Sequence, residues 1–93
     1  MIVSFGDADT KMLWERGRSR RISANLRRSA FRKLAILNAA IELSNLKVPP
    51  GNHLEALTKD RKGQHSIRVN DQYRICFRWS EGNARDVEVV DYH

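Results

Sequence analysis

The sequence predicts an α+β fold in which an N-terminal strand and a helical hairpin precede an antiparallel sheet. Apolar residues recur at steps of three and four in the first half of the chain, as in helices, and alternate with polar residues in the second half, as in strands. The run Pro49-Pro50-Gly51-Asn52 separates the two halves, because a helix cannot continue through it. We therefore expect the order β-α-α-β-β-β(-β), with both helices packed on one face of the sheet.

The N-terminal strand is expected over residues 1–5, where the sequence is short, β-prone and followed by Gly6. A first helix should follow through Trp14, and Gly17 should end it. Three residues before this helix offer side chains that can cap its amides: Asp7, Asp9 and Thr10.

A second and longer helix is expected after Ser23, a plausible N-cap, and should end near Ser44. Its predicted apolar stripe consists of Leu26, Ala30, Leu34, Leu37 and Ile41. The basic residues Arg27, Arg28, Arg32 and Lys33 lie off that stripe and should face solvent.

The second half of the chain reads as strands joined by turns. Strands are expected at residues 54–57, 65–69, 73–79 and 87–90, with turns at 59–63, 70–72 and 81–83. Ile67, Val69 and the alternate residues Tyr73, Ile75, Phe77 and Trp79 should face the core. The opposite face should carry Ser66, Arg68, Arg74, Cys76 and Arg78.

Composition favours one small globular domain, residues 1–93, with a phosphate-rich partner. The formal charge is +6 and the sequence pI is about 10.1. The alternatives are a basic domain that is simply soluble and one that binds an acidic protein. Cys76 stands alone, which excludes an internal disulfide, and we expect it to be a buried small residue. No signal peptide or long apolar run is present, so we expect a cytoplasmic protein.

The predicted second face of the sheet is rich in arginine. Arg68, Arg74 and Arg78 should project the same way from one hairpin. Adjacent guanidinium groups repel one another unless an anion lies between them, and a phosphate satisfies them bidentately. The alternative is a solvated face on which Asp86 or Glu88 balances the charge.

The chain ends in Asp91-Tyr92-His93, which groups an acid, a phenol and an imidazole. Cleavage of RNA through the ribose 2′-OH needs a base, an acid and a positive group beside the phosphate. His93 can act as acid or base, and Asp91 can orient it or accept a proton. Tyr92 can stack on a base or donate a proton, and Arg74 can hold the phosphate. An ordinary polar terminus is the alternative, and strand alternation should point Tyr92 and His93 to opposite faces.

The histidines give little sign of a metal site. His53, His65 and His93 match no ligand spacing, and no carboxylate or cysteine pattern completes them, so we expect no metal and no cofactor. The arginines at 18–21 and 27–28 are expected to be a solvated face or, alternatively, to dock on the phosphates of structured RNA.

A family resemblance is carried by residues 49–52, 54–57 and 60–77 and by the closing Val89-Val90-Asp91-Tyr92-His93. With these motifs the chain resembles HigB-type toxins, including GraT-like members, of the RelE/ParE superfamily of toxin–antitoxin modules. The resemblance extends over essentially the whole chain. It implies a RelE-like fold and a ribosome-dependent endoribonuclease that cuts mRNA codons in the ribosomal A site, leaving a 2′,3′-cyclic phosphate. It also implies a HigA-type helix-turn-helix antitoxin, through which the module would contact operator DNA.

Position by position, the resemblance assigns Asp91, Tyr92 and His93 to the catalytic terminus and Arg74 to phosphate binding. Some relatives have histidine at the position of Glu55 and lysine at that of Thr58. We expect His53, two residues before Glu55, to share its strand face as a possible replacement. Positive charge for RNA binding is expected from Arg68, Arg78, Lys59, Arg61 and Lys62.

Two other functions fit the same superfamily. ParE-like relatives inhibit DNA gyrase with the same fold and need no ribonuclease site, and an inactive relative would serve only as an antitoxin's partner or co-repressor. The terminal Asp91-Tyr92-His93 favours the ribonuclease over the gyrase inhibitor, and a toxicity test would separate the inactive relative from both.

Overall fold

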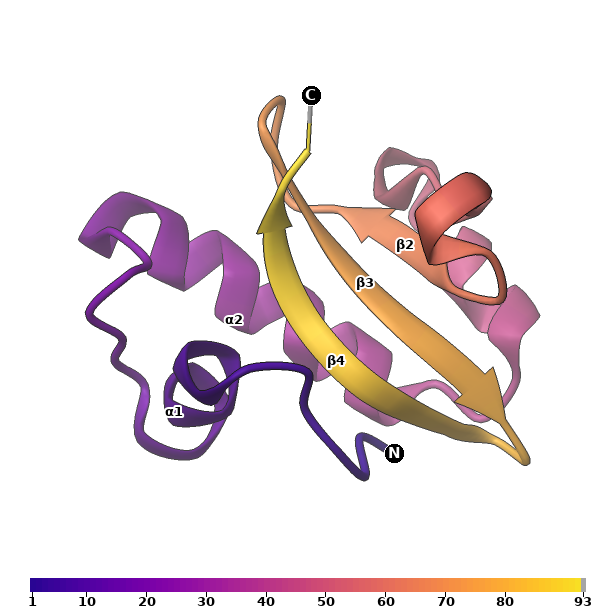
Figure 1. Cartoon of the computed structure of the whole chain (residues 1–93), viewed down its shortest axis with the longest axis horizontal. Helices are drawn as coiled ribbons and strands as arrows, with labels where there is room; N and C mark the ends of the chain where they lie inside the picture. Colours follow the sequence, from indigo (N-terminus) through magenta and orange to yellow (C-terminus); the bar gives the residue numbers. More distant parts are fainter. Residues whose placement is uncertain (93) are drawn as a thin grey trace.

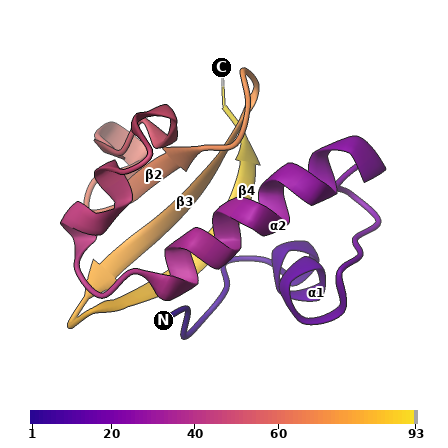
Figure 2. The same ribbon diagram turned by 180° about the vertical axis from the view of Figure 1, so that it is seen from behind.

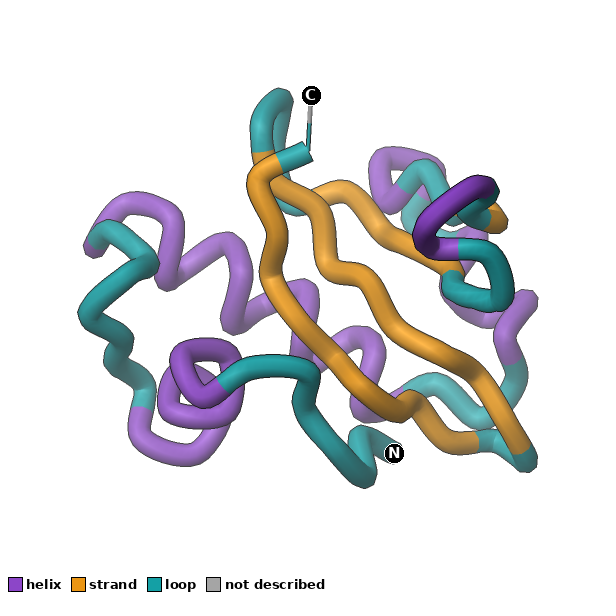
Figure 3. Tube along the Cα trace, viewed as in Figure 1, coloured by secondary structure: helices purple, strands orange, loops and turns teal. Residues whose placement is uncertain are grey.

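The structure, a computed structural model, describes residues 1–92 and has the predicted α+β architecture (Figures 1 and 3). Within these residues the strands form one four-stranded sheet in the order β1-β2-β3-β4, with every neighbouring pair antiparallel. The helices are α1 (Ala8–Arg16) and α2 (Ala24–Ala39), and the 3₁₀ turns are η1 (Leu43–Lys47), η2 (Pro50–Asn52) and η3 (Lys59–Arg61). The strands are β1 (Glu55–Ala56), β2 (His65–Arg68), β3 (Tyr73–Ser80) and β4 (Asn83–Asp91).

Both ends of α1 are formed by the residues that the sequence indicated. The carboxylate of Asp7 accepts a hydrogen bond from the backbone N–H of Thr10 at 2.6 Å and so caps the first turn. Gly17 has φ 71°, in the left-handed region, and its N–H donates to the Leu13 carbonyl at 2.9 Å. The predicted first helix is therefore confirmed.

Helix α2 begins after Ser23 as predicted but ends at Ala39 instead of near Ser44. Ala40 is extended, and the Asn45 side-chain oxygen accepts the backbone N–H groups of Ile41 at 3.0 Å and Glu42 at 2.9 Å. These bonds replace the helical ones, and the chain turns into η1. Ile41 is 78% exposed, so its expected place on the apolar stripe is wrong.

The N-terminal segment lies along β4 but does not form the expected strand (Figure 1). It makes only isolated parallel bridges within the described residues, Ile2 with Ala84 and Phe5 with Val87. Gly6 then passes so close to β4 that a Cβ there would lie 3.0 Å from the Asp86 carbonyl oxygen. The segment nevertheless covers the outer edge of β4, which limits edge-to-edge association.

One face of the sheet is covered by α2, which runs across β3 and β4, while α1 packs against α2 and β4 (Figure 2). Burial of this face confirms the predicted core side chains, since Ile67, Ile75 and Phe77 are fully buried and Tyr73 and Trp79 pack against them. The helices contribute Leu13, Leu26, Ala30, Leu34 and Leu37 to the same cluster. The core therefore lies between α2 and the sheet, and the other face is left for the candidate site.

The strand limits differ modestly from the expected ones. β1 keeps only the middle of residues 54–57, β2 stops at Arg68, one residue before Val69, and β4 starts at Asn83 rather than Val87. The register between β3 and β4 shifts between Cys76 and Arg78, where β4 carries one extra residue. The long β3–β4 ladder extends to Asp91, which ties the C-terminal segment to the sheet.

Lys33 is buried and not, as expected, exposed on the outer side of α2. Its ammonium donates a hydrogen bond to the side-chain oxygen of the fully buried Asn52. Asn52 in turn donates to the carbonyls of Leu46 at 3.2 Å and Val48 at 3.3 Å. Burial, and secondarily the charge of Arg32, lowers the pKa of Lys33 below its ordinary value. This polar cluster fixes η1 and η2 to α2.

We expect Asn52→Ala to destabilise the fold by about 3 kcal/mol, because it leaves a buried ammonium without its acceptor. Lys33→Met should cost less, about 1–2 kcal/mol, because it also removes the desolvated charge. Since folding lowers the pKa of Lys33, the wild type should gain stability relative to Lys33→Met as pH rises toward the ordinary lysine value of 10.5. Urea unfolding at several pH values measures both effects, and equal losses for the two variants would contradict them.

Candidate functional site

Arg74 is the centre of the sheet face that α2 does not cover. The residue is 8% exposed, and its guanidinium is held from several sides. Nε donates to the Ser66 hydroxyl at 2.7 Å, and Nη2 donates to the backbone carbonyl of His53. A buried guanidinium held in this way has few rotamers available, so its charge is preorganised.

Glu55 supplies the carboxylate beside that guanidinium. Its Oε1 lies 3.2 Å from Nη2 of Arg74, and the Glu55 side chain is 51% exposed against 10% for that of Arg74. The strand register explains the contact. Glu55 pairs directly with Ser66, so the two side chains share a face, and the Ser66 hydroxyl is the group that binds Arg74. A buried positive group thus meets an accessible carboxylate at the sheet surface.

The C-terminal segment contributes Tyr92 to this face. The guanidinium carbon of Arg74 lies 5.9 Å from the centre of the Tyr92 ring, within the range of a cation–π contact. The backbone N–H of Tyr92 donates to the Gln72 carbonyl at 2.7 Å, which fixes the chain there. Tyr92 is 41% exposed, so its ring is available to a ligand.

Asp91 lies on the other face of the sheet. It pairs with Tyr73, a core-facing residue, and its carboxylate accepts a hydrogen bond from the Gln72 side chain at 3.0 Å. Alternation along β4 therefore separates Asp91 from Arg74 and Tyr92. His93, the expected proton-transfer residue, lies outside the described residues.

A second ion pair borders Arg74. Nη1 of Arg61 lies 2.7 Å from Oε1 of Glu88, and this hydrogen bond raises the pKa of Arg61. Glu88 pairs across the sheet with Cys76, which is fully buried on the same face. Burial raises the pKa of the Cys76 thiol, against a smaller opposing effect of Arg61. Cys76 is thus an inert packing residue, as its sequence environment indicated.

The expected open cluster of arginines is not found on this face. Arg68 does pair directly with Arg74 across the hairpin, but its guanidinium is bound to Asp71. Nε of Arg78 lies 3.6 Å from Asp86. Each arginine therefore has its own carboxylate, as in the alternative of a balanced face, because acidic residues from turns and from β4 reach the same surface.

His53 does not share the strand face of Glu55, and that prediction is wrong. It follows η2 with φ 44°, in the left-handed region, and contributes its backbone carbonyl to Arg74. Lys59 and Lys62 are exposed at either end of the η3 turn, and neither forms an ion pair within residues 1–92. Ser66, which orients Arg74, was missed as a site residue, although its alternation with Ile67 placed it on this face.

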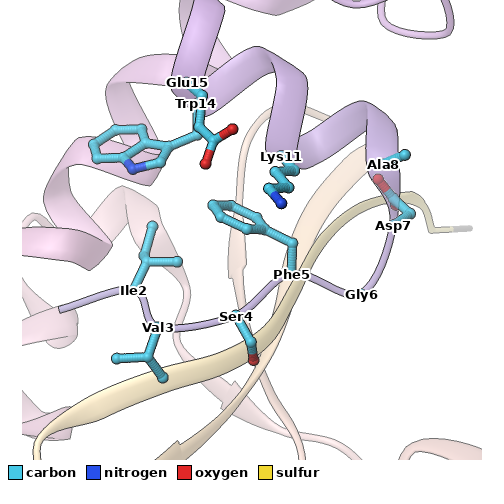
Figure 4. A pocket seen from close by; sticks show the side chains of 10 residues that line it. All are labelled: Ile2, Val3, Ser4, Phe5, Gly6, Asp7, Ala8, Lys11, Trp14 and Glu15. Carbon is cyan, nitrogen blue, oxygen red and sulfur yellow. The ribbon is translucent and has the colours of Figure 1, made fainter.

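A wide cavity of about 710 Å³ lies elsewhere, between the N-terminal segment and α1 (Figure 4). Phe5, Trp14 and Ile2 line it together with Lys11 and Glu15. It contains none of the groups gathered around Arg74. Among residues 1–92, no three side chains of the histidine, cysteine or carboxylate types gather in a way that would hold a metal ion.

The arrangement around Arg74 suits chemistry on a phosphodiester. A fixed guanidinium can neutralise the phosphate, a neighbouring carboxylate can accept a proton, and an exposed aromatic ring can stack on a base. The described part of the chain has no helix that is both long and apolar enough to span a membrane.

Known proteins resemble the chain over nearly its whole length. The sequence model of the family described as "RelE-like toxin of type II toxin-antitoxin system HigB" matches residues 3–93. Toxin HigB-1 of Vibrio cholerae is 44% identical over 85 residues, which cover 90% of each chain. Endoribonuclease HigB of Proteus vulgaris is 31% identical over the full length of both chains.

The fold is also that of a solved structure, the YoeB–YefM complex from Staphylococcus aureus. One of its chains superposes with a TM-score of 0.61 at 15% identity, covering 100% of this chain and 95% of that one. The fold thus agrees with the family match over residues 3–93. The chain belongs to the HigB family of RelE-like toxins of type II toxin–antitoxin systems.

Proposed function

We propose that the chain is a ribosome-dependent endoribonuclease that cleaves mRNA codons in the ribosomal A site. The observation that carries the proposal is the convergence of Arg74, Glu55 and Tyr92 on one sheet face. The name of the Proteus vulgaris relative, an endoribonuclease, supports the same reaction. Such a toxin acts where ribosomes are, in the cytoplasm.

In the proposed reaction the Glu55 carboxylate takes the proton of the ribose 2′-OH. The 2′-oxygen attacks the phosphorus, the bond to the 5′-oxygen breaks, and a 2′,3′-cyclic phosphate forms. Arg74 neutralises the charge that develops on the phosphate oxygens, and Tyr92 stacks on a neighbouring base. His93 delivers a proton to the departing 5′-oxygen; the family resemblance assigns this residue to the catalytic terminus.

The geometry favours Glu55 over Asp91 as the base. Glu55 touches Arg74, whereas Asp91 lies on the opposite face with Gln72. Asp91 then acts by holding the C-terminal segment in register, which keeps Tyr92 beside Arg74. Exposed Lys59 and Lys62 add positive charge at the border of the site.

The partners follow from the same assignment. We propose a HigA-type helix-turn-helix antitoxin that neutralises the toxin, with operator DNA contacted only through that antitoxin. The complex of the structural relative, which pairs YoeB with YefM, supports a protein partner of this kind.

We expect the wild-type chain to cut mRNA bound to translating ribosomes at the A site and to cut the same mRNA poorly when free. A site with few catalytic groups depends on the ribosome to align the 2′-OH with the leaving oxygen. His93→Ala should lose cleavage yet keep its fold and antitoxin binding. Primer extension with and without ribosomes measures the cuts.

Three outcomes would contradict the assignment. Efficient cleavage of free mRNA would show that the reaction does not need the ribosome. Full activity of His93→Ala would show that the reaction does not need the His93 imidazole. Absence of cleavage combined with inhibition in a gyrase supercoiling assay would favour a ParE-like function instead.

A further inference from the structure

One of the groups that hold Arg74 is a backbone carbonyl in an unusual conformation. Nη2 of Arg74 donates to the carbonyl of His53, the residue that follows η2. His53 has φ 44° and ψ 56°, in the left-handed region, which a residue with a Cβ adopts at a cost and keeps only when its surroundings hold it. The His53 side chain is exposed, so the direction of its carbonyl depends on how the neighbouring backbone is anchored.

Asn52, the last residue of η2, anchors the backbone that enters His53. It is fully buried, and its side-chain amide donates to the carbonyls of Leu46 at 3.2 Å and Val48 at 3.3 Å. These bonds tie η2 to the preceding turn, η1. Asn52 therefore fixes one end of the peptide unit that continues into His53.

The side-chain oxygen of Asn52 binds a group from the helical side of the sheet. It accepts a hydrogen bond from the ammonium of Lys33 on α2, the helix that covers the face away from Arg74 (Figure 2). Lys33 is 9% exposed, and in the described part of the chain no carboxylate forms an ion pair with it. A buried ammonium without its acceptor is strongly unfavourable, so Lys33 holds Asn52 in one position.

The segment that Lys33 anchors carries two groups that meet Arg74. It leads through His53 to Glu55, whose Oε1 lies 3.2 Å from Nη2, the same nitrogen that donates to the His53 carbonyl. A shift of residues 52–55 would therefore move the carbonyl and the carboxylate together and would reorient the guanidinium. Displacement of a reacting group by about 1 Å can cost roughly 100-fold in rate.

Stability alone does not require a buried charge at this position. Apolar side chains of similar size can often replace both members of a buried polar pair without loss of stability. An apolar contact has little preferred direction, whereas the hydrogen bonds made by Lys33 and by the Asn52 amide orient the chain. The polar cluster is thus suited to holding a carbonyl in one direction.

We propose that Lys33 is a positioning residue of the active site, which acts through Asn52 and the His53 carbonyl to orient the Arg74 guanidinium. The proposal rests on the proposed function, in which Arg74 neutralises the phosphate. Lys33 acts on the reaction from α2 without contacting the RNA. Its loss should leave Arg74 charged and able to attract the RNA, but less well aligned with the phosphate when the 2′-oxygen attacks.

The first test is single-turnover cleavage of ribosome-bound mRNA by the wild type and by Lys33→Met, with rates expressed per folded molecule. We expect the maximal rate to fall by about 10–100-fold, while the half-saturating toxin concentration changes by less than about threefold. This split separates alignment in the bound state from binding. Lys33→Met is preferred to Asn52→Ala because it also removes the desolvated charge and so destabilises the fold less.

Two control variants separate positioning from charge and from stability. Lys47→Met makes the same side-chain change at an exposed position on η1 and should keep the wild-type rate. Ile22→Val, in the connection between the helices, removes one methyl group from a residue that is 2% exposed. It should lower the melting temperature to an extent similar to Lys33→Met and still keep the wild-type rate per folded molecule.

The second test needs no substrate. The Arg74 Nε–H donates to the Ser66 hydroxyl at 2.7 Å and should exchange slowly with water in the free wild-type toxin. We expect Lys33→Met to accelerate this exchange by roughly tenfold or more, because the guanidinium loses one of its anchors, and Ile22→Val to leave it unchanged. Nitrogen–proton NMR measures the exchange, and the resonance is assigned by its absence from Arg74→Lys.

The two tests fail separately from the proposed function. A wild type that does not cut ribosome-bound mRNA would contradict the proposed function, and the Nε–H exchange would still show whether Lys33 orients Arg74. Unchanged exchange in Lys33→Met would overturn the inference, as would a wild-type cleavage rate in that variant. An equal loss of rate in Ile22→Val would also overturn it, because lower stability would then explain the effect.

Discussion

Arg74→Ala is expected to reduce cleavage of ribosome-bound mRNA by about 10²–10³-fold, because it removes the positive group that is fixed beside the phosphate. The Ser66 hydroxyl and the His53 carbonyl hold the Arg74 guanidinium in one position. Water molecules that filled the vacated space would not be held in this way and would stabilise the phosphate less. Arg74→Lys should recover only part of the rate, because an ammonium keeps the charge but cannot reproduce the forked geometry. Single-turnover primer extension measures the loss.

Loss of the fold has to be separated from loss of chemistry. Removing a buried guanidinium leaves its hydrogen-bond partners unsatisfied, and we expect a destabilisation of about 1–3 kcal/mol. Arg85→Ala, at an exposed position on β4, removes the same charge and should retain near-full activity. If Arg74→Ala lost activity only in proportion to its unfolded fraction, Arg74 would be structural and not catalytic.

Glu55→Gln is expected to reduce cleavage by about 10²–10⁴-fold while leaving the fold nearly intact. Glutamine keeps an oxygen that can accept the hydrogen bond of Arg74, but it cannot take the proton of the 2′-OH. The side chain is half exposed, so the substitution leaves no deeply buried polar group unsatisfied.

A matched substitution tests whether the loss is specific to this carboxylate. Glu15→Gln, an exposed change on α1, removes the same charge and should keep the wild-type rate. An unchanged rate in Glu55→Gln would transfer the role of base to the end of the chain, where His93 lies.

Local patterns in the sequence predicted most of the fold. The steps of three and four located α1 and α2, and alternation identified the core side chains of β2 and β3, including Ile67 and Phe77. The exact ends were less predictable, because they depend on single hydrogen bonds. The Asn45 side chain ends α2 by accepting hydrogen bonds from the N–H groups of Ile41 and Glu42. The spacing of apolar residues along the sequence does not reveal that contact.

The candidate site was only partly predictable. Arg74 and Tyr92 were identified from the sequence, and the structure brings them together. The structure also places Glu55 beside Arg74, excludes His53 from the strand, and separates Asp91 from both. Each of these results depends on how β1 and β4 pair with their neighbours, and pairing partners are not encoded in the local pattern.

The sequence by itself determined the order of the elements, the face of each strand that forms the core, and the family signature at the C-terminus. Only the tertiary structure decided which charges are neutralised. Arg61 and Glu88 are 27 residues apart in sequence and their side chains lie 2.7 Å apart in space, while Arg27 and Arg28 of α2 form no ion pair within residues 1–92. The physical reason is that periodicity is a property of neighbouring residues, whereas Coulomb energy depends on distances that exist only after folding.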